Sequence, residues 1–258
     1  GRGMISAEKN SAIRYARRLV NESRHLVAFT GAGMSTASGI PDFRSKGTGL
    51  WEHDDPMAVA SLTTFRTNPR RFWEWKRGLM RQIWQAQPNP AHLALAQLEA
   101  GGLLKALITQ NIDGLHQRAG SRKVYELHGT IETLTCPSCR RKFHADQFRQ
   151  VIETSDEIPL CPDCQAVIKP DVVLFEEMLP QITWTEAERH CTRADVIIVA
   201  GSSLEVWPAA TLPEIAVSNG AKLILVNLSP TFMDPRAEVL LTANVAEALP
   251  LLVEPPLV

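Results

Sequence analysis

Residues 25–35 read HLVAFTGAGMS, a short apolar run that passes directly into a glycine-rich turn. The run His25–Thr30 predicts one buried strand, and its continuous apolar character is typical of a parallel sheet covered on both faces. A glycine-rich turn at the end of such a strand presents unhindered N–H groups that can bind phosphate oxygens. Thr36 stands where the dinucleotide-binding spacing G-x-G-x-x-G needs its third glycine. The turn alone therefore leaves open both a phosphate site and a plain connection between a strand and a helix.

The rest of the chain alternates short apolar runs with segments of helical periodicity. Asn68-Pro69 and Asn89-Pro90 each place an N-cap residue before a proline at the first helical position. Helices are predicted over Ile5–Val20, from Pro69 to before Pro88, and over Pro90–Ala100, Thr185–Arg193, Pro208–Asn219 and Ala246–Val253. Further strands are predicted at Leu104–Thr109, Val124–Leu127, Val172–Phe175, Val196–Ala200 and Leu223–Val226. This alternation predicts an α/β fold, in which helices cover both faces of a parallel sheet.

The composition is that of a globular protein, with 45% hydrophobic and 21% charged residues among 258. These values exclude disorder as the main state. The net charge of −1 supplies no overall attraction to nucleic acid or to an anionic membrane. No apolar run reaches the roughly 20 residues that a membrane helix needs, and no segment resembles a secretory signal. We therefore expect a cytoplasmic protein that binds neither membranes nor nucleic acid directly.

Four of the five cysteines form two C-x2-C pairs, Cys136–Cys139 and Cys161–Cys164. Four thiolates on two turns are the ligand set of a tetrahedral Zn²⁺ site, and the alternative is a pair of redox dithiols. A site with four cysteine ligands leaves no position for water or substrate, so we expect one structural ion. The surrounding residues 135–168 are polar and predict a small zinc-binding module, inserted into an α/β domain formed by residues 4–134 and 169–258. Cys191 is interpreted as a core residue.

Polar residues follow several of the predicted strands. Gly201-Ser202-Ser203 follows one strand and Asn227 another, while Gln110, Asn111 and Asp113 follow a third. Ligands of open α/β sheets bind at the carboxyl ends of strands, so these groups together predict a nucleotide site. His128-Gly129 ends a further strand, and His128 is either a general base or an ordinary structural histidine.

Together these stretches resemble the sirtuins, the NAD-dependent protein-lysine deacylases. The stretches that carry the resemblance are GAGMSTASGIPDFR (31–44), TQNIDGLH (109–116), HG (128–129), the four cysteines, KPDVV (169–173), GSSLEVWPAA (201–210) and VNLSP (226–230). The resemblance implies a Rossmann-like sheet with a small zinc-ribbon module. It also implies an enzyme that consumes NAD to remove an acyl group from a lysine of a protein or peptide, releasing nicotinamide and O-acyl-ADP-ribose.

The resemblance further implies a role for each matching residue. His128 would be the general base, in a catalytic group with Asn111 and Asp113. The remaining NAD contacts would come from Gly31, Ala32, Gly33, Ser35, Asp42, Phe43, Arg44, Gln110, Gly201, Ser202, Ser203, Asn227, Leu228, Ser229 and Val245. The substrate peptide would pair as an added strand with Val173, Phe175, Glu176, Glu205 and Val206. Cys136, Cys139, Cys161 and Cys164 would hold the zinc ion.

Two positions depart from patterns in the family. Glu176 stands where sirtuins usually have glycine. The Glu176 side chain would narrow the peptide groove, repel acidic peptides or face outward without effect. Our hypothesis is that Glu176 alters the peptide preference and leaves catalysis intact. Sirtuins that prefer acidic acyl groups carry a Tyr and an Arg three residues apart on the helix that starts at Pro69. Alignment by eye places Lys76 and Leu79 there, which predicts a preference for acetyl or other apolar acyl groups.

The predicted NAD pocket and zinc module are also compatible with other functions. A mono-ADP-ribosyltransferase would need the same NAD pocket, and an NAD-binding regulatory protein would keep the pocket with weak turnover. The basic run Arg140–Lys142 on the zinc module would favour nucleic-acid binding, but it is only three residues long, so a solvated basic turn is the favoured interpretation. Nothing in the sequence demands an oligomer, and we expect a monomer.

Overall fold

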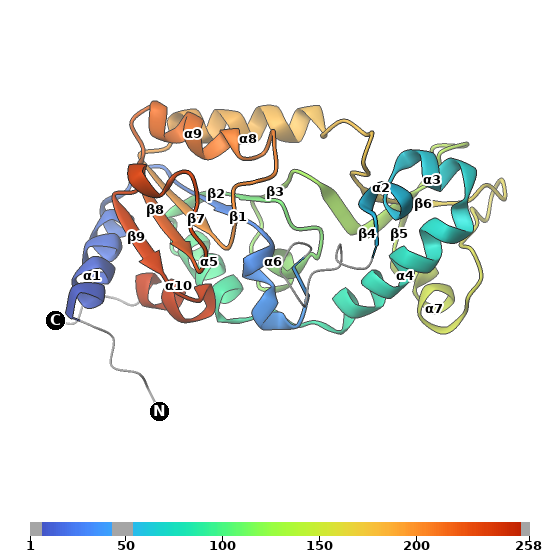
Figure 1. The fold of residues 1–258 in the computed structure, drawn as a ribbon, viewed down its shortest axis with the longest axis horizontal. Helices are drawn as coiled ribbons and strands as arrows, with labels where there is room; N and C mark the ends of the chain where they lie inside the picture. Colours follow the sequence, from blue (N-terminus) through green and yellow to red (C-terminus); the bar gives the residue numbers. More distant parts are fainter. Residues whose placement is uncertain (1–6, 43–53, 254–258) are drawn as a thin grey trace.

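The computed structural model describes residues 7–42 and 54–253. Its main feature is a six-stranded parallel sheet in the order β3-β2-β1-β7-β8-β9 (Figure 1). The strands are β1 (Leu26–Thr30), β2 (Leu104–Thr109), β3 (Val124–Glu126), β7 (Val196–Ala200), β8 (Lys222–Asn227) and β9 (Val239–Thr242). Every neighbouring pair is parallel, which confirms the predicted fold class.

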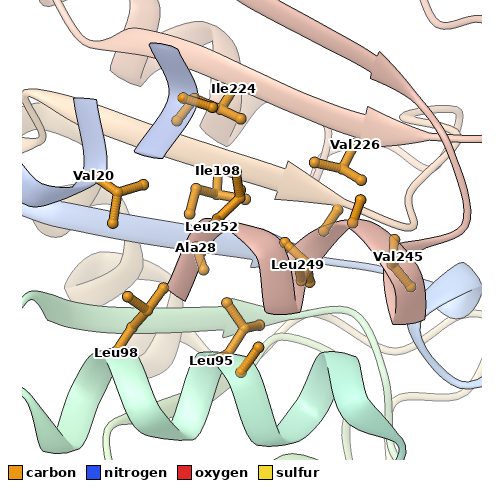
Figure 2. Close-up of a cluster of buried hydrophobic side chains, with 14 of the residues drawn as sticks. Val20, Ala28, Leu95, Leu98, Ile198, Ile224, Val226, Val245, Leu249 and Leu252 are labelled. Carbon is orange, nitrogen blue, oxygen red and sulfur yellow. The ribbon is translucent and has the colours of Figure 1, made fainter. Parts of the chain in front are cut away.

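Helices cover both faces of this sheet because successive side chains of a buried strand point to opposite sides. Ala28 and Ile198 belong to a cluster with α1 (Ala7–Glu22), α5 (Pro90–Ala100) and α10 (Val245–Val253). Figure 2 shows Leu95 and Leu98 of α5 and Leu249 of α10 packed on that side. The opposite face packs on α8 (Gln181–Arg193) and α9 (Thr211–Ser218), where Cys191 is buried as a core residue.

A second, smaller unit lies at one end of the sheet (Figure 1). Its three-stranded antiparallel sheet runs β5-β4-β6, formed by Lys142–His144, Gly129–Thr135 and Lys169–Val172. One hydrophobic cluster joins this sheet to α7 (Asp146–Thr154), α3 (Leu62–Thr67) and α4 (Pro69–Gln85). The remaining short helices are α2 (Pro56–Val59) and α6 (Leu115–Arg118). The boundaries at residues 135 and 168 stay a prediction, and this packing favours counting α3 and α4 with the zinc module.

Some local predictions were wrong. The run Val172–Phe175 was expected in the parallel sheet, but β6 ends at Val172 and pairs antiparallel with β4, where Gly129 opposes Val172. The edge strand β9 was missed because only Val239 and Leu241 of its four residues are buried. Helix α7 was missed because polar residues surround its two buried positions, Phe148 and Ile152.

Helix limits also shift. Helix α8 begins at Gln181, one turn before the predicted Thr185, and α9 begins at Thr211. The glycine turn after β1 continues as two 3₁₀ turns, Ala32–Met34 and Thr36–Ser38, with another 3₁₀ turn at Asp234–Arg236. Among the described residues, no helix combines the length and apolar character needed to cross a membrane.

Candidate active site between the two units

A cavity of about 1050 Å³ is lined by both units. It is large enough for a dinucleotide together with part of a second substrate, since ligand pockets commonly reach roughly 300–1,000 Å³. Most of the site residues predicted from the sequence line it: Ala32, Gly33, Ser35, Asp42, Gln110, Asn111, Asp113, His128, Val173, Phe175, Glu176, Gly201, Ser202, Ser203, Glu205, Val206, Asn227 and Ser229. The fold thus brings together residues that lie far apart in the sequence.

Three predicted contacts do not line this cavity. Gly31 is not among the lining residues, and its N–H donates to the Ala200 carbonyl at 3.2 Å. The Leu228 side chain is 65% exposed. Val245 is buried in the core cluster of α10 (Figure 2). Phe43 and Arg44 lie outside the described residues.

Close backbone contact explains two of the glycines. The Gly33 N–H donates to the Gly201 carbonyl at 2.7 Å, so the turns after β1 and β7 touch directly. Gly201 has φ of 63°, and a Cβ atom there would lie 2.4 Å from the Met34 nitrogen. Only glycine tolerates both the conformation and the contact. These two turns therefore form a fixed wall at the carboxyl ends of the strands.

Neighbouring polar side chains are held in place by one another. The Ser202 hydroxyl donates to Gln110 Oε1 at 2.8 Å, and Asn227 Nδ2 donates to the Ser202 and Ser229 carbonyls at 3.0 and 2.9 Å. Asn111 Nδ2 donates to the Gly31 carbonyl at 2.9 Å. Such a preorganised wall of glycine turns, serine hydroxyls and amides fits a dinucleotide at the strand ends.

His128 is oriented by the backbone. Its Nδ1 lies 3.0 Å from the Gln110 carbonyl oxygen. A carbonyl only accepts hydrogen bonds, so the proton resides on Nδ1 and the lone pair of neutral His128 is on Nε2. Burial lowers the pKa of His128, although the Gln110 hydrogen bond opposes that shift. The imidazole is therefore neutral at pH 7 and can accept a proton.

Gly129 has a structural reason to follow His128. Its φ is 79°, and a Cβ atom there would lie 2.0 Å from the Asp171 carbonyl oxygen. The backbone of β4 at Gly129 therefore lies in direct contact with the backbone of β6 at Asp171, next to His128, which lines the cavity. The Val173 N–H donates to the His128 carbonyl at 2.8 Å, which ties the segment after β6 to the same residue.

Asp113 is 4% exposed, and both of its carboxylate oxygens are hydrogen-bonded. The Ser35 hydroxyl donates to Oδ2 at 2.6 Å, and the Leu115 N–H donates to Oδ1 at 3.0 Å. Ser35 was predicted as an NAD contact, and the structure also makes it a partner of Asp113. These two hydrogen bonds fix the orientation of the Asp113 carboxylate, which lines the cavity.

Two buried histidines, His92 and His116, were not predicted from the sequence. His92 Nε2 lies 3.4 Å from the Ser35 hydroxyl, and His116 Nε2 lies 2.9 Å from the Thr30 hydroxyl. Burial lowers the pKa of His92 to about 4 and that of His116 to about 3, so both stay neutral at pH 7. The only local signal was the position of His92, whose Nδ1 accepts from the Asn89 N–H at the start of α5.

The four predicted zinc ligands converge outside the cavity. Their sulfur atoms all lie within 4.8 Å of one another, with Cys136 and Cys164 at 3.4 Å and Cys139 and Cys161 at 3.7 Å. A tetrahedron with Zn–S bonds of about 2.3 Å has edges of about 3.8 Å. Both knuckles close in the same way, since the N–H groups of Arg140 and Gln165 donate to the carbonyls of Cys136 and Cys161. The cluster therefore fits one tetrahedral ion.

Glu176 joins the rim of the cavity to α3. Its carboxylate accepts hydrogen bonds from the Thr63 N–H at 3.0 Å and the Thr63 hydroxyl at 2.8 Å. These bonds lower the pKa of Glu176. Its φ is 78°, a left-handed conformation that is costly for glutamate. Backbone bonds of Phe175 with Ala60 and Leu62 continue the connection, each at 3.1 Å.

Comparisons with known proteins identify relatives over nearly the whole chain. Residues 31–208 match the profile of the Sir2 family. NAD-dependent protein deacylase 2 of Archaeoglobus fulgidus is 48% identical, over 94% of this chain and 95% of its own length. The NAD-dependent protein deacetylase of Thermotoga maritima is 46% identical, over 89% of this chain and 92% of its own.

Solved structures of Sir2 proteins have the same fold. A complex of Sir2 with a p53 peptide and NAD⁺ has a TM-score of 0.82 and 43% identity, covering 92% of this chain and 95% of its own. Sir2Af2 bound to a myristoylated histone peptide has a TM-score of 0.80 and 42% identity, covering 95% of each chain.

Proposed function

Since the chain belongs to the Sir2 family and is an NAD-dependent protein deacylase, we propose that His128 is its general base and that the cavity holds NAD against an acylated lysine. The observation that carries this proposal is the hydrogen bond between His128 Nδ1 and the Gln110 carbonyl. It leaves Nε2 as the basic nitrogen of a residue that lines the cavity. A positioned base of this kind contributes about 10²–10⁴-fold to a rate.

NAD, when bound, supplies the ADP-ribosyl group that accepts the acyl group as nicotinamide leaves. The turn that contains Ala32, Gly33 and Ser35 would hold its diphosphate. Gln110, Asn111 and Asp113 would line the nicotinamide side of the cavity. Gly201, Ser202, Ser203, Asn227 and Ser229 would bind the adenosine half. Gly31, Leu228 and Val245 do not line the cavity, and they stay predicted contacts of NAD.

The peptide would lie between the segment Val173–Glu176 and the segment Glu205–Val206, which both line the cavity. An extended peptide in that position forms main-chain hydrogen bonds as an added strand, which gives affinity without dependence on sequence. His128 lies next to the first segment, since its carbonyl accepts from the Val173 N–H. This arrangement would bring the acylated side chain to the base.

The direct test incubates the protein with NAD and an acetyl-lysine peptide and follows all masses. The expected result is NAD-dependent loss of the acetyl group, with one O-acetyl-ADP-ribose and one nicotinamide formed per peptide. ADP-ribose attached to protein, without peptide deacylation, would instead indicate a mono-ADP-ribosyltransferase. Binding of NAD without any product would indicate a regulatory protein. The cytoplasmic location, the monomeric state and the lack of nucleic-acid binding stay predictions.

Glu176→Gly is expected to raise the KM for the peptide about 3- to 10-fold and to leave kcat within about twofold. The substitution relieves the left-handed strain but removes both hydrogen bonds to Thr63, so the segment that pairs with the peptide loses its attachment to α3. Steady-state kinetics with saturating NAD measures both constants.

Thr63→Val provides the matched control, because it removes only the hydroxyl donor and leaves the N–H. We expect a smaller rise in KM from Thr63→Val alone and no further rise when it is added to Glu176→Gly. Equal changes in kcat and KM would contradict this role for Glu176.

A further inference from the structure

His116 is a buried histidine of the short helix α6 (Figure 1). It is 1% exposed and does not line the cavity. Its Nδ1 is enclosed by the protein and has no hydrogen-bond partner in the described part of the chain. An unpaired buried polar atom costs stability, and an apolar side chain would avoid that cost. Packing alone therefore does not account for a histidine at this position, which leaves its second nitrogen as the group with a role.

This second nitrogen, Nε2, begins a hydrogen-bond chain. It lies 2.9 Å from the Thr30 hydroxyl oxygen, and the Thr30 hydroxyl donates to Thr109 Oγ1 at 2.8 Å. A hydroxyl has one hydrogen, so the Thr30 oxygen accepts from an N–H at Nε2. Burial and His92 lower the pKa of His116 to about 3, so the ring is neutral at pH 7. Both threonines are buried as well, so bulk water does not compete for these hydrogen bonds.

The hydrogen-bond chain ends at the backbone of Asn111. Thr109 Oγ1 accepts from the Asn111 N–H at 3.0 Å. Thr30 and Thr109 are the last residues of β1 and β2, and they lie opposite each other in the sheet. Hydrogen bonds that follow one another in a buried setting polarise and strengthen each other. The hydrogen-bond chain therefore crosses two neighbouring strand ends and holds the backbone just beyond them.

The segment held in this way belongs to the proposed NAD site. Asn111 lines the cavity, and its side chain donates to the Gly31 carbonyl at 2.9 Å. Its neighbour Gln110 also lines the cavity and supplies the carbonyl that lies 3.0 Å from His128 Nδ1. His116 and both threonines are not lining residues. They therefore act on the site through this segment and not by contact with a substrate.

The other buried histidine, His92, is different because both of its nitrogens have partners. Nδ1 accepts from the Asn89 N–H at 3.1 Å, and Nε2 lies 3.4 Å from the Ser35 hydroxyl. These contacts compensate for the burial of His92 and support the start of α5. The side chain of His116 has Thr30 as its one hydrogen-bond partner among the described residues. Its hydrogen bond therefore serves the strand ends at the cavity and no helix end.

We propose that His116 is a positioning residue, which acts through two buried threonine hydroxyls to hold Asn111 in the orientation that the nicotinamide end of NAD requires. This inference rests on the proposed function, which places nicotinamide beside Asn111. A displacement of about 1 Å at a reacting group can lower a rate about 100-fold, so a hydrogen bond outside the cavity can affect catalysis. Loss of the hydrogen-bond chain leaves the Asn111 N–H unpaired and weakens the binding of nicotinamide more than that of the peptide.

The test compares Thr109→Val, which removes the hydroxyl at nearly constant volume, with Thr109→Ser, which keeps the hydroxyl. With an acetyl-lysine peptide, Thr109→Val should lower kcat/KM for NAD about 10-fold. It should also raise the inhibition constant of the product nicotinamide about 10-fold and leave the KM for the peptide within about twofold. Thr109→Ser should stay within about threefold of the natural protein in every constant.

His116 is tested by a parallel pair of variants. His116→Phe removes Nε2, whereas His116→Gln keeps an N–H donor and should recover most of the loss. His116→Phe should reproduce the constants of Thr109→Val, and the double variant should be no worse than either single one, because both break the same hydrogen-bond chain. Thr30→Val breaks the link between the two sites and decides the question if His116→Phe does not fold. Natural constants in Thr30→Val would refute the proposal.

Other results would also overturn the proposal. If Thr109→Ser is as impaired as Thr109→Val, packing matters and the hydroxyl does not. Equal losses for NAD and peptide, with a lower Tm, would indicate a structural role. Absence of product from the natural protein would contradict the proposed function itself. Calorimetry of NAD binding then decides the His116 proposal separately: binding about 5-fold weaker to Thr109→Val than to Thr109→Ser supports it, and equal binding or none refutes it.

Discussion

His128→Ala is expected to lower kcat for deacylation by about 10²–10⁴-fold, the usual contribution of a positioned general base. The KM values for NAD and peptide should change little, because the His128 ring is proposed to act on a proton and not to hold either substrate. Zinc content and Tm should also stay near those of the natural protein. His144→Ala is the matched control, since His144 is an exposed histidine of β5 that does not line the cavity.

The pH dependence provides a second measure of the same residue. Burial lowers the pKa of His128 below its usual value, so the neutral form predominates at pH 7. kcat/KM should therefore be flat near neutral pH and fall only as the pH drops through the lowered pKa, where His128 gains a proton and no longer accepts one. An activity of His128→Ala within threefold of the natural protein, or an unchanged acid limb, would contradict the assignment.

Cys136→Ala is expected to abolish zinc binding, deacylase activity and the folded state of the smaller unit together. Structural zinc contributes on the order of 10–16 kcal/mol in small zinc-binding peptides, which is as large as the roughly 5–15 kcal/mol by which whole domains are stable. Cys136 and Cys161 are fully buried in the hydrophobic cluster that also contains Trp73 and Met80 of α4. Loss of the ion therefore disturbs α4 and the cavity wall as well as the cysteine knuckles.

The measurements are zinc per chain by atomic emission, activity, and the sites of limited proteolysis. Cleavage is expected in the smaller unit, between residues 56 and 85 and between 129 and 172. The six-stranded sheet should stay protected because it has its own core on both faces. Cys191→Ala is the control, since Cys191 is buried against that sheet and should leave one zinc per chain. A Cys136→Ala protein with full zinc content and the natural cleavage pattern would rule out this role.

Short-range patterns were enough to predict the sheet and the zinc ligands. Both signals lie within a few consecutive residues. One is the apolar run at residues 26–30 followed directly by Gly31, and the other is the spacing of two residues within each C-x2-C pair. Buried strands need continuous apolar residues, and a C-x2-C turn brings two thiolates together by itself. For the same reason β9 was missed: it is an edge strand with only two buried positions, and its local pattern is weak.

The arrangement of the site depended on contacts between residues far apart in the chain. The Gln110 carbonyl selects the basic nitrogen of His128, and Thr63 holds Glu176 across more than a hundred residues. No local pattern encodes such pairs, because hydrogen bonds, burial and pKa values depend on which groups packing brings together. In the sequence, Lys76 is one position of an amphipathic helix, and alignment with the family places it at the acyl pocket without showing whether it is buried. Only the tertiary structure shows that it is buried beside Lys169 in the cavity wall, where no carboxylate of the described residues pairs with it.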